Sequence, residues 1–191
     1  MKTRLQLRAF HEWLAHDPMG RPKPGDMPAA DVVNPDGSGG VALNAARNGY
    51  VSFRVLVKGR GEYRLDARMG SGLEVDVFRA WYHRMHTEPG KAAAWWPDAM
   101  IPVDARTVQQ LPDLDNAIPG QTTQEYWVDI FVPRDAEPGP VDGQIRLASG
   151  RDAVALPVRV EVLEAVIPDE PCVAMDNNSY GCRWLPGMYP K

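Results

Sequence analysis

Two adjacent tryptophans, Trp95 and Trp96, are the residues of this 191-residue sequence whose type and spacing first suggest a ligand. They lie in an apolar stretch, residues 92–102, that two prolines interrupt. An indole ring offers a large apolar face that suits the C–H face of a pyranose, so this pair could bind a sugar by stacking. The competing interpretation, which we favour, is that both rings anchor a long loop onto the fold, because bulky aromatic side chains are mostly buried.

Three aspartates of the same region, Asp98, Asp113 and Asp115, could supply carboxylates for acid–base chemistry. Glycoside hydrolysis uses two carboxyl groups roughly 5 to 10 Å apart across a cleft. Asp113 and Asp115 stand beside Pro112 and Asn116, however, and this composition is typical of a turn. The cluster also lacks the spacing and the terminal glutamate of a calcium-binding loop. We therefore interpret Asp113 and Asp115 as turn residues and predict no catalytic residue in this chain.

Metal ligands are sparse in this sequence. His83 and His86 are three residues apart, so on a strand they face opposite sides and would not chelate one ion. The two cysteines, Cys172 and Cys182, could form a disulfide that closes a short loop in an oxidising compartment, but we favour two unpaired thiols. No CxxC spacing occurs, and the glycine run at 37–40 does not join a strand to a helix as a phosphate-binding loop does. We predict no metal site and no cofactor.

The composition narrows the class of partner. Lys and Arg number 21 and Asp and Glu number 25, which gives a formal net charge of −4 and no broad field to attract nucleic acid. No apolar run is long enough to span a bilayer. The first 17 residues lack the continuous apolar core of a signal peptide, so the chain is either intracellular or a signal was removed, and the sequence leaves the compartment open.

Alternating apolar and polar residues are the main structural signal. In residues 126–132 the apolar set Tyr126, Val128, Ile130 and Val132 alternates with residues of a second, partly buried face. Residues 144–148 and 154–166 repeat the pattern, and the short turn at 149–152 predicts a hairpin between them. We expect these three strands to form one antiparallel sheet, covered by a second layer.

The rest of the chain predicts more strands of this kind. Residues 3–10 alternate, although a helix there is a fair competitor, and residues 41–46 lead into Asn48-Gly49, a strong hairpin signal before the strand at 51–58. Residues 63–67 and 73–81 alternate between glycine-rich turns, whereas residues 87–124 look irregular.

These strands, with 18 prolines and 17 glycines, predict an all-β fold. We expect an antiparallel β-sandwich of seven or eight strands, immunoglobulin-like or jelly-roll-like, with a long irregular loop and a C-terminal tail. The proline-bounded segment after residue 167 reads as a linker into a further domain. We therefore divide the chain into a sandwich at 1–168 and a linker with the start of another domain at 169–191.

Five segments resemble glycoside hydrolase family 123 and its relatives, in the order in which that family carries them. ALNAARNGYVSFRVLVKG resembles the opening of the sandwich that precedes the family's catalytic barrel, and WWPDAMIPV resembles a loop motif. YWVDIFVPRDAEPGPVDGQIRLAS is similar to a family hairpin, LPVRVEVLEAVIPDEP to the last sandwich strand with the exit linker, and MDNNSYG to the first barrel strand. Together they cover most of residues 41–181, but Gly49 replaces the family's usual glutamate and the barrel is missing.

The resemblance implies an accessory domain whose partner is a C-terminal catalytic barrel of the same polypeptide. That barrel would hydrolyse hexosaminides with help from the substrate's own acetamido group, and no residue here inherits its catalytic acidic pair. Asn178 and Tyr180 would lie at the end of the first barrel strand, where barrel enzymes bind substrate. The alternatives are a stand-alone module that binds carbohydrate or protein, and an immunoglobulin-like scaffold without a ligand.

Overall fold

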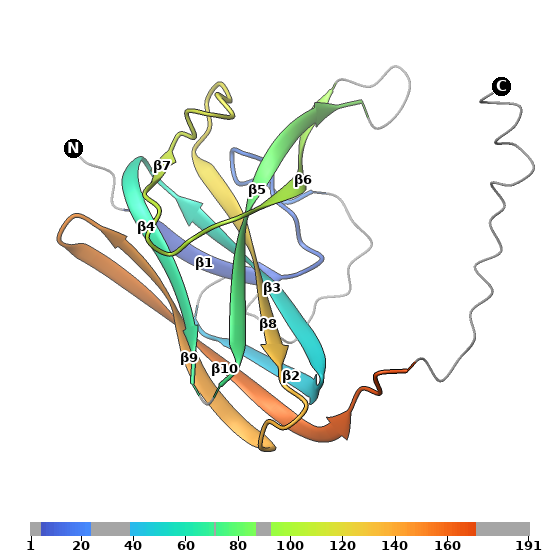
Figure 1. The fold of residues 1–191 in the computed structure, drawn as a ribbon. Helices are drawn as coiled ribbons and strands as arrows, with labels where there is room; N and C mark the ends of the chain where they lie inside the picture. The colour runs from blue at the N-terminus through green and yellow to red at the C-terminus, as the bar shows by residue number, and fades with distance from the viewer. Residues whose placement is uncertain (1–4, 24–38, 71, 87–92, 171–191) are drawn as a thin grey trace, which may run out of the picture.

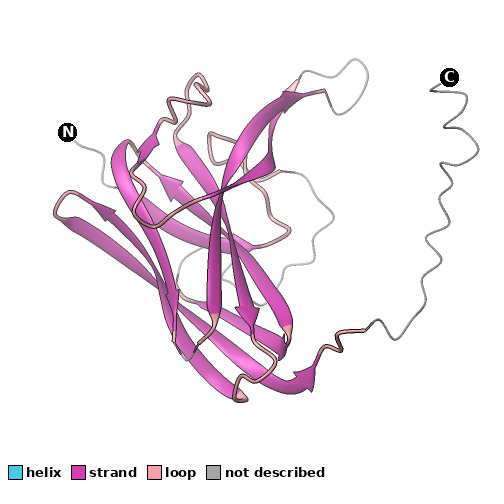
Figure 2. Cartoon of the chain, viewed as in Figure 1, coloured by secondary structure: helices cyan, strands magenta, loops and turns pink. Residues whose placement is uncertain are grey.

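The computed structural model describes residues 5–23, 39–70, 72–86 and 93–170. Within these residues the chain forms ten strands and no helix, which confirms the predicted all-β class (Figure 2). The strands are β1 (Gln6–His11), β2 (Val41–Arg47), β3 (Gly49–Lys58), β4 (Gly61–Met69), β5 (Glu74–Met85), β6 (Ala94–Pro102), β7 (Gln109–Leu111), β8 (Thr123–Val132), β9 (Gly139–Ser149) and β10 (Asp152–Val166).

The strands form two layers of five strands each, as a β-sandwich requires (Figure 1). The first sheet has the order β1-β3-β8-β5-β6, and the second sheet has the order β2-β10-β9-β4-β7. The strand pairs are antiparallel apart from β2 and β10, which run parallel. The predicted sandwich is confirmed, with ten strands in place of seven or eight.

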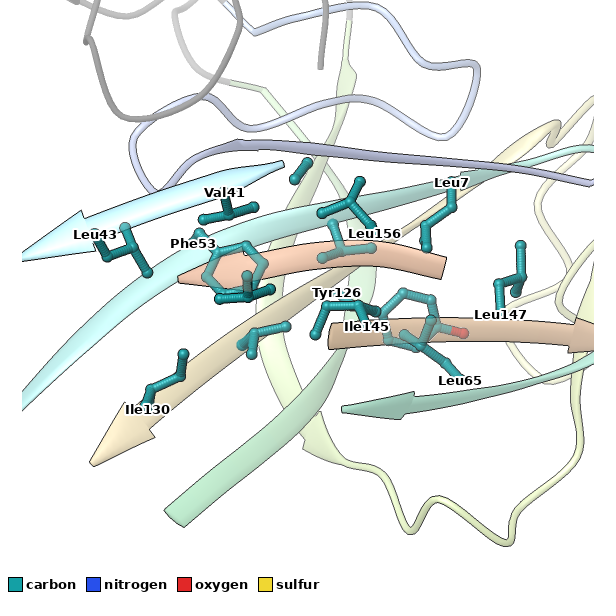
Figure 3. Packing of buried hydrophobic residues seen from close by; sticks show 14 of the residues in the cluster. Leu7, Val41, Leu43, Phe53, Leu65, Tyr126, Ile130, Ile145, Leu147 and Leu156 are labelled. Atoms are coloured by element: carbon teal, nitrogen blue, oxygen red, sulfur yellow. The ribbon is translucent and has the colours of Figure 1, made fainter. Parts of the chain in front are cut away.

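The core lies between the sheets and follows the predicted alternation. Tyr126, Val128, Ile130 and Val132 of β8 are all at most 1% exposed, while the residues between them are half-buried. Phe53 and Ile130 of the first sheet lie across from Leu156 and other side chains of the second (Figure 3). Burying one such side chain contributes about 1.5 to 3 kcal/mol, so this apolar interface provides most of the driving force for folding.

The N-terminal segment is a strand, and the helical alternative is wrong. β1 pairs with β3 over six residues, from Gln6 opposite Lys58 to His11 opposite Phe53. Leu7 and Ala9 point into the core, and Arg8 between them is exposed. Pairing with β3 buries alternate residues of the segment, whereas a helix would bury residues three and four apart.

The predicted Asn48-Gly49 hairpin is wrong, because β2 and β3 belong to different sheets. The turn is a corner at which the chain crosses from the second sheet to the first. Asn48 adopts a positive φ of 59°, a conformation that asparagine tolerates, and its Nδ2 donates to the carbonyl oxygen of Ile167 at 2.9 Å. The turn signal thus predicted a chain reversal correctly, but it carries no information about the strand with which the reversed chain pairs.

The three strands that we expected in one sheet are divided between both. β9 and β10 form the predicted hairpin, with Ser149 opposite Asp152, but β8 lies in the first sheet between β3 and β5. The proline-rich segment after β8 carries the chain from one layer to the other, since a proline cannot continue the ladder of hydrogen bonds.

Residues 87–124 were predicted as irregular, but their described part, from residue 93 on, contains β6, β7 and the first residues of β8. β6 is the edge strand of the first sheet and pairs with β5. Pro97 lies where this register shifts, between Trp81 and Tyr82, and an edge strand with a bulge is where a sheet tolerates proline. β7 is three residues long and pairs with β4. The prolines hid these strands from the sequence pattern.

Candidate functional site

The first sheet carries a fully buried glutamate, Glu125, at the start of β8. Its Oε2 accepts hydrogen bonds from the backbone nitrogen of His16 at 2.7 Å and lies 3.2 Å from the His16 Nδ1, and its Oε1 pairs with Arg54 Nη1. The side chains of His16 and Arg54 are only 4% and 12% exposed. A buried carboxylate is tolerated where such partners compensate for lost hydration, so these three residues, the Glu125 cluster, act as one unit.

Residues 12–23, the N-terminal arm, cover Glu125 on the outer face of the first sheet. The nitrogens of Thr122 and Thr123 both donate to the carbonyl of Pro18 at 3.0 Å, and Thr123 Oγ1 donates to the carbonyl of Asp17 at 3.2 Å. Gly20 has a φ of 81°, and a Cβ there would lie 2.9 Å from the Cγ2 of Thr123. These contacts fix the arm closely against the sheet and exclude water from Glu125.

Buried tyrosines surround the same region. The backbone nitrogen of Glu125 donates to the Tyr82 hydroxyl at 3.2 Å, and the hydroxyls of Tyr63 and Tyr126 lie 2.7 Å apart. Burial raises the pKa values of Tyr82 and Tyr126 well above the ordinary tyrosine value. At Tyr82 the negative charge of Glu125 raises the pKa further. Burial also raises the pKa of Tyr63. The phenols therefore stay protonated and hold polar groups together inside the fold.

Asp113 stabilises a turn, as the composition of residues 112–116 predicted. Its Oδ1 accepts from the backbone nitrogen of Asp115 at 2.9 Å, and its Oδ2 pairs with Arg79 Nη1 at 2.8 Å. The Asp113 backbone nitrogen donates to the Oε1 of the buried Gln121 at 2.7 Å. Asp98 is exposed on β6, away from these contacts. The Asp113 carboxylate is thus engaged in hydrogen bonds that order the segment between β7 and β8.

Trp95 and Trp96 are both half-buried on β6, opposite Arg84 and His83 of β5. The Lys23 Nζ lies 4.5 Å from the centroid of the Trp96 ring, and burial lowers the pKa of this lysine, although Asp17 opposes that shift. Trp96 Nε1 is buried without a hydrogen-bond partner. One face of Trp96 is therefore in contact with the N-terminal arm, and sugar binding by the pair stays a prediction.

Several other predicted residues can be placed only in part. His83 and His86 are exposed at the end of β5, as a solvated strand end requires. Asn178, Tyr180, Cys172 and Cys182 lie outside the described residues. In the described part of the chain, no three His, Cys, Asp or Glu side chains gather in an arrangement that would hold a metal ion. Nor does any helix there have the length and apolarity to cross a membrane.

A small cavity of about 150 Å³ opens between β4 and β5. Its lining residues include Leu65 and Ala67 of β4, Val75, Asp76 and Val77 of β5, and Val103 after β6. The Val103 nitrogen donates to the Val77 carbonyl at 2.8 Å, which closes one side of the opening. A hollow of this size, with Asp76 as its one charged lining residue, offers little for chemistry, because a ligand site brings several polar groups together.

No protein-family model matches this sequence, and no curated protein matches it either. Among solved structures, the chain is similar to a family 123 glycoside hydrolase from Clostridium perfringens, studied for glycolipid glycan hydrolysis, with a TM-score of 0.57 and 12% identity. That match covers 86% of this chain and 28% of the glycosidase. Human CEP192 PapD-like domain 7 and the PorA N-terminal domain match at TM-scores of 0.30 and 0.29, with 7% identity each. The first match shows a shared fold between this chain and part of a much longer enzyme.

Proposed function

We propose that this chain is an accessory β-sandwich domain of a glycoside-hydrolase-like protein and is non-catalytic by itself. It would pack against a C-terminal catalytic barrel of the same polypeptide that acts on hexosaminide-containing glycans. The observation that carries the proposal is the structural match, in which 86% of this chain corresponds to 28% of a family 123 glycosidase. A domain of this size inside a larger enzyme is best explained as a support for the part that holds the chemistry.

Two buried carboxylates, those of Glu125 and Asp113, support the non-catalytic part of the proposal. The carboxylate of Glu125 is fully buried under the N-terminal arm, and that of Asp113 is 5% exposed and bonded to a turn and to Arg79. A general acid or base must reach a proton on a substrate. Groups that are covered and saturated with internal partners instead stabilise the domain.

The end of the sandwich supports a rigid connection to a following domain. Asp169 Oδ1 accepts from Asn48 Nδ2 at 2.8 Å, and its Oδ2 pairs with Arg134 Nη1 at 2.6 Å. The nitrogen of Ile167 donates to the Arg47 carbonyl at 2.9 Å. Because these bonds fix the direction in which the chain leaves β10, they would set the orientation of the following barrel, whose linker and first residues we place at 169–191.

The proposal is tested by assaying this chain and a longer form, extended past Lys191, with chromogenic N-acetylhexosaminides. We expect hydrolysis only by the longer form. Hydrolysis by the present chain alone would refute the non-catalytic role. Absence of hydrolysis in both forms, with a folded barrel shown by circular dichroism, would refute the hexosaminide assignment.

A stand-alone carbohydrate-binding module is the second candidate, and the half-exposed pair Trp95 and Trp96 favours it. The unpaired Trp96 Nε1 is a donor that an acetamido carbonyl could satisfy if Lys23 moved from the ring. Titration of the tryptophan fluorescence with N-acetylhexosamines tests this function, with Trp95→Ala as the matched variant. A flat response would exclude sugar binding at this pair.

A further inference from the structure

The outer face of the first sheet is divided into a covered half and an open half. The N-terminal arm covers the half that contains Glu125 and Leu56, which are 0% and 6% exposed although they point away from the core. The open half contains the outward-facing residues of β3, β8 and β5 nearer the other end of the sandwich. We call it the open face and define it as Tyr50, Ser52, Glu74, Asp76, Phe78, Trp127, Asp129 and Phe131.

Three acidic side chains, those of Glu74, Asp76 and Asp129, lie on the open face. Asp76 stands directly opposite Asp129 in the register of β5 and β8, and Glu74 stands opposite Phe131. Like charges in directly opposed positions destabilise a sheet. Arg54, the neighbouring base on β3, is engaged with Glu125 and with the Glu12 carbonyl. Within the described residues, no basic side chain forms an ion pair with these three acids.

The acids lie next to an exposed aromatic surface. Tyr50 is 65% exposed, and its ring centroid lies 4.9 Å from that of Phe131 at an interplanar angle of 42°. Asp129 Oδ1 accepts from Ser52 Oγ at 2.5 Å and from Trp127 Nε1, so this carboxylate is held in place. Arg54 already stacks on Trp127 at 4.8 Å, which leaves Tyr50 as the accessible ring. A fixed carboxylate and an exposed aromatic ring at diagonal positions of neighbouring strands match the two preferences of a guanidinium group, ion pairing and stacking.

From this arrangement we infer that the open face binds an arginine-containing segment of a protein partner. One guanidinium would lie over Tyr50 and donate hydrogen bonds to Asp129 and Asp76, which relieves the repulsion between the two aspartates. A neutral sugar would stack on Tyr50 but would leave that repulsion uncompensated. The charge complementarity therefore favours a basic protein segment over a glycan, and the inference does not depend on the proposed enzymatic context.

The test measures binding of acetyl-Arg4-amide to the whole chain by nuclear magnetic resonance at low salt, with the tetra-citrulline peptide as the neutral analogue. We expect shifts centred on Tyr50, Asp76 and Trp127 with the arginine peptide alone. Asp76→Asn should weaken binding at least tenfold. Asp152→Asn, the same charge change at an exposed position of the second sheet, should change it less than twofold. Tyr50→Ala should also weaken binding, because it removes the ring on which the guanidinium would stack. It leaves the charge of the open face unchanged.

Thermal unfolding gives an independent readout. Asp76→Asn should raise the Tm by about 1 to 4 °C, because it removes one of two opposed like charges. Better stability together with weaker binding is the combination that identifies a binding residue rather than a structural one. Equal weakening by Asp76→Asn and Asp152→Asn would show attraction to the net charge only and would overturn the inference. Shifts at Tyr50 with N-acetylgalactosamine but not with the arginine peptide would overturn it in favour of a glycan.

Discussion

Replacing Glu125 by glutamine should destabilise this fold strongly, because the change removes the negative charge that compensates Arg54. Glutamine keeps the shape of the side chain and one acceptor for the His16 nitrogen. The loss of stability therefore reports mainly on the removed negative charge. Breaking a buried ion pair on one side typically costs about 3 to 5 kcal/mol. The Arg54 side chain is 12% exposed and reaches some water, so we expect the lower end of that range, about 3 kcal/mol.

Urea denaturation followed by tryptophan fluorescence measures this free energy of unfolding. Glu137→Gln is the matched control, since Glu137 is exposed and should change stability by no more than about 0.5 kcal/mol. The double variant Glu125→Gln, Arg54→Met should recover part of the loss, because it removes the charge left without a partner. A loss of unfolding free energy below about 1 kcal/mol for Glu125→Gln would refute this reasoning. So small a loss would mean that the ion pair between Glu125 and Arg54 does not hold the N-terminal arm in place.

Two further predictions concern the buried tyrosines and the glycines. Because burial raises the pKa of the three buried tyrosines, their contribution to stability is complete below the ordinary pKa near 10 and is lost as the pH rises above it. The free energy of unfolding should fall by up to about 4 kcal/mol per pH unit there. Urea denaturation at increasing pH measures this fall, and a free energy of unfolding that stays constant above about pH 10 would contradict it. Gly143→Ala should cost about 2 kcal/mol or more in urea denaturation, because its Cβ would lie 2.4 Å from the Arg68 carbonyl. Gly49→Ala should cost less, since the atom that it meets is the mobile Cδ1 of Ile167, and equal losses would contradict that argument.

The strands and the core residues could be predicted from the sequence because side chains alternate along a strand whatever its partner. Tyr126 and Val128 were predicted on one apolar face, and both are fully buried. Strand partners could not be predicted in the same way, since alternation specifies a face and not a neighbour. Asn48-Gly49 therefore predicted a hairpin, whereas the chain crosses there between sheets.

The Glu125 cluster was missed for a related reason. Glu125 falls on the polar face of an alternating strand, where a glutamate is normally solvated. It is buried because the N-terminal arm, whose His16 is 109 residues away in sequence, covers that face. The open face was missed likewise, because the opposition of Asp76 and Asp129 exists only in the register of two strands that the sequence does not align.

The central proposal, an accessory domain of a larger glycosidase, is tested most directly by the length of the natural protein. We would measure its intact mass from the source and read the coding frame past Lys191. An accessory domain requires several hundred further residues that form a barrel with acidic pairs at its strand ends. A natural chain that stops at Lys191 would contradict the account, because the proposed catalytic partner would not exist.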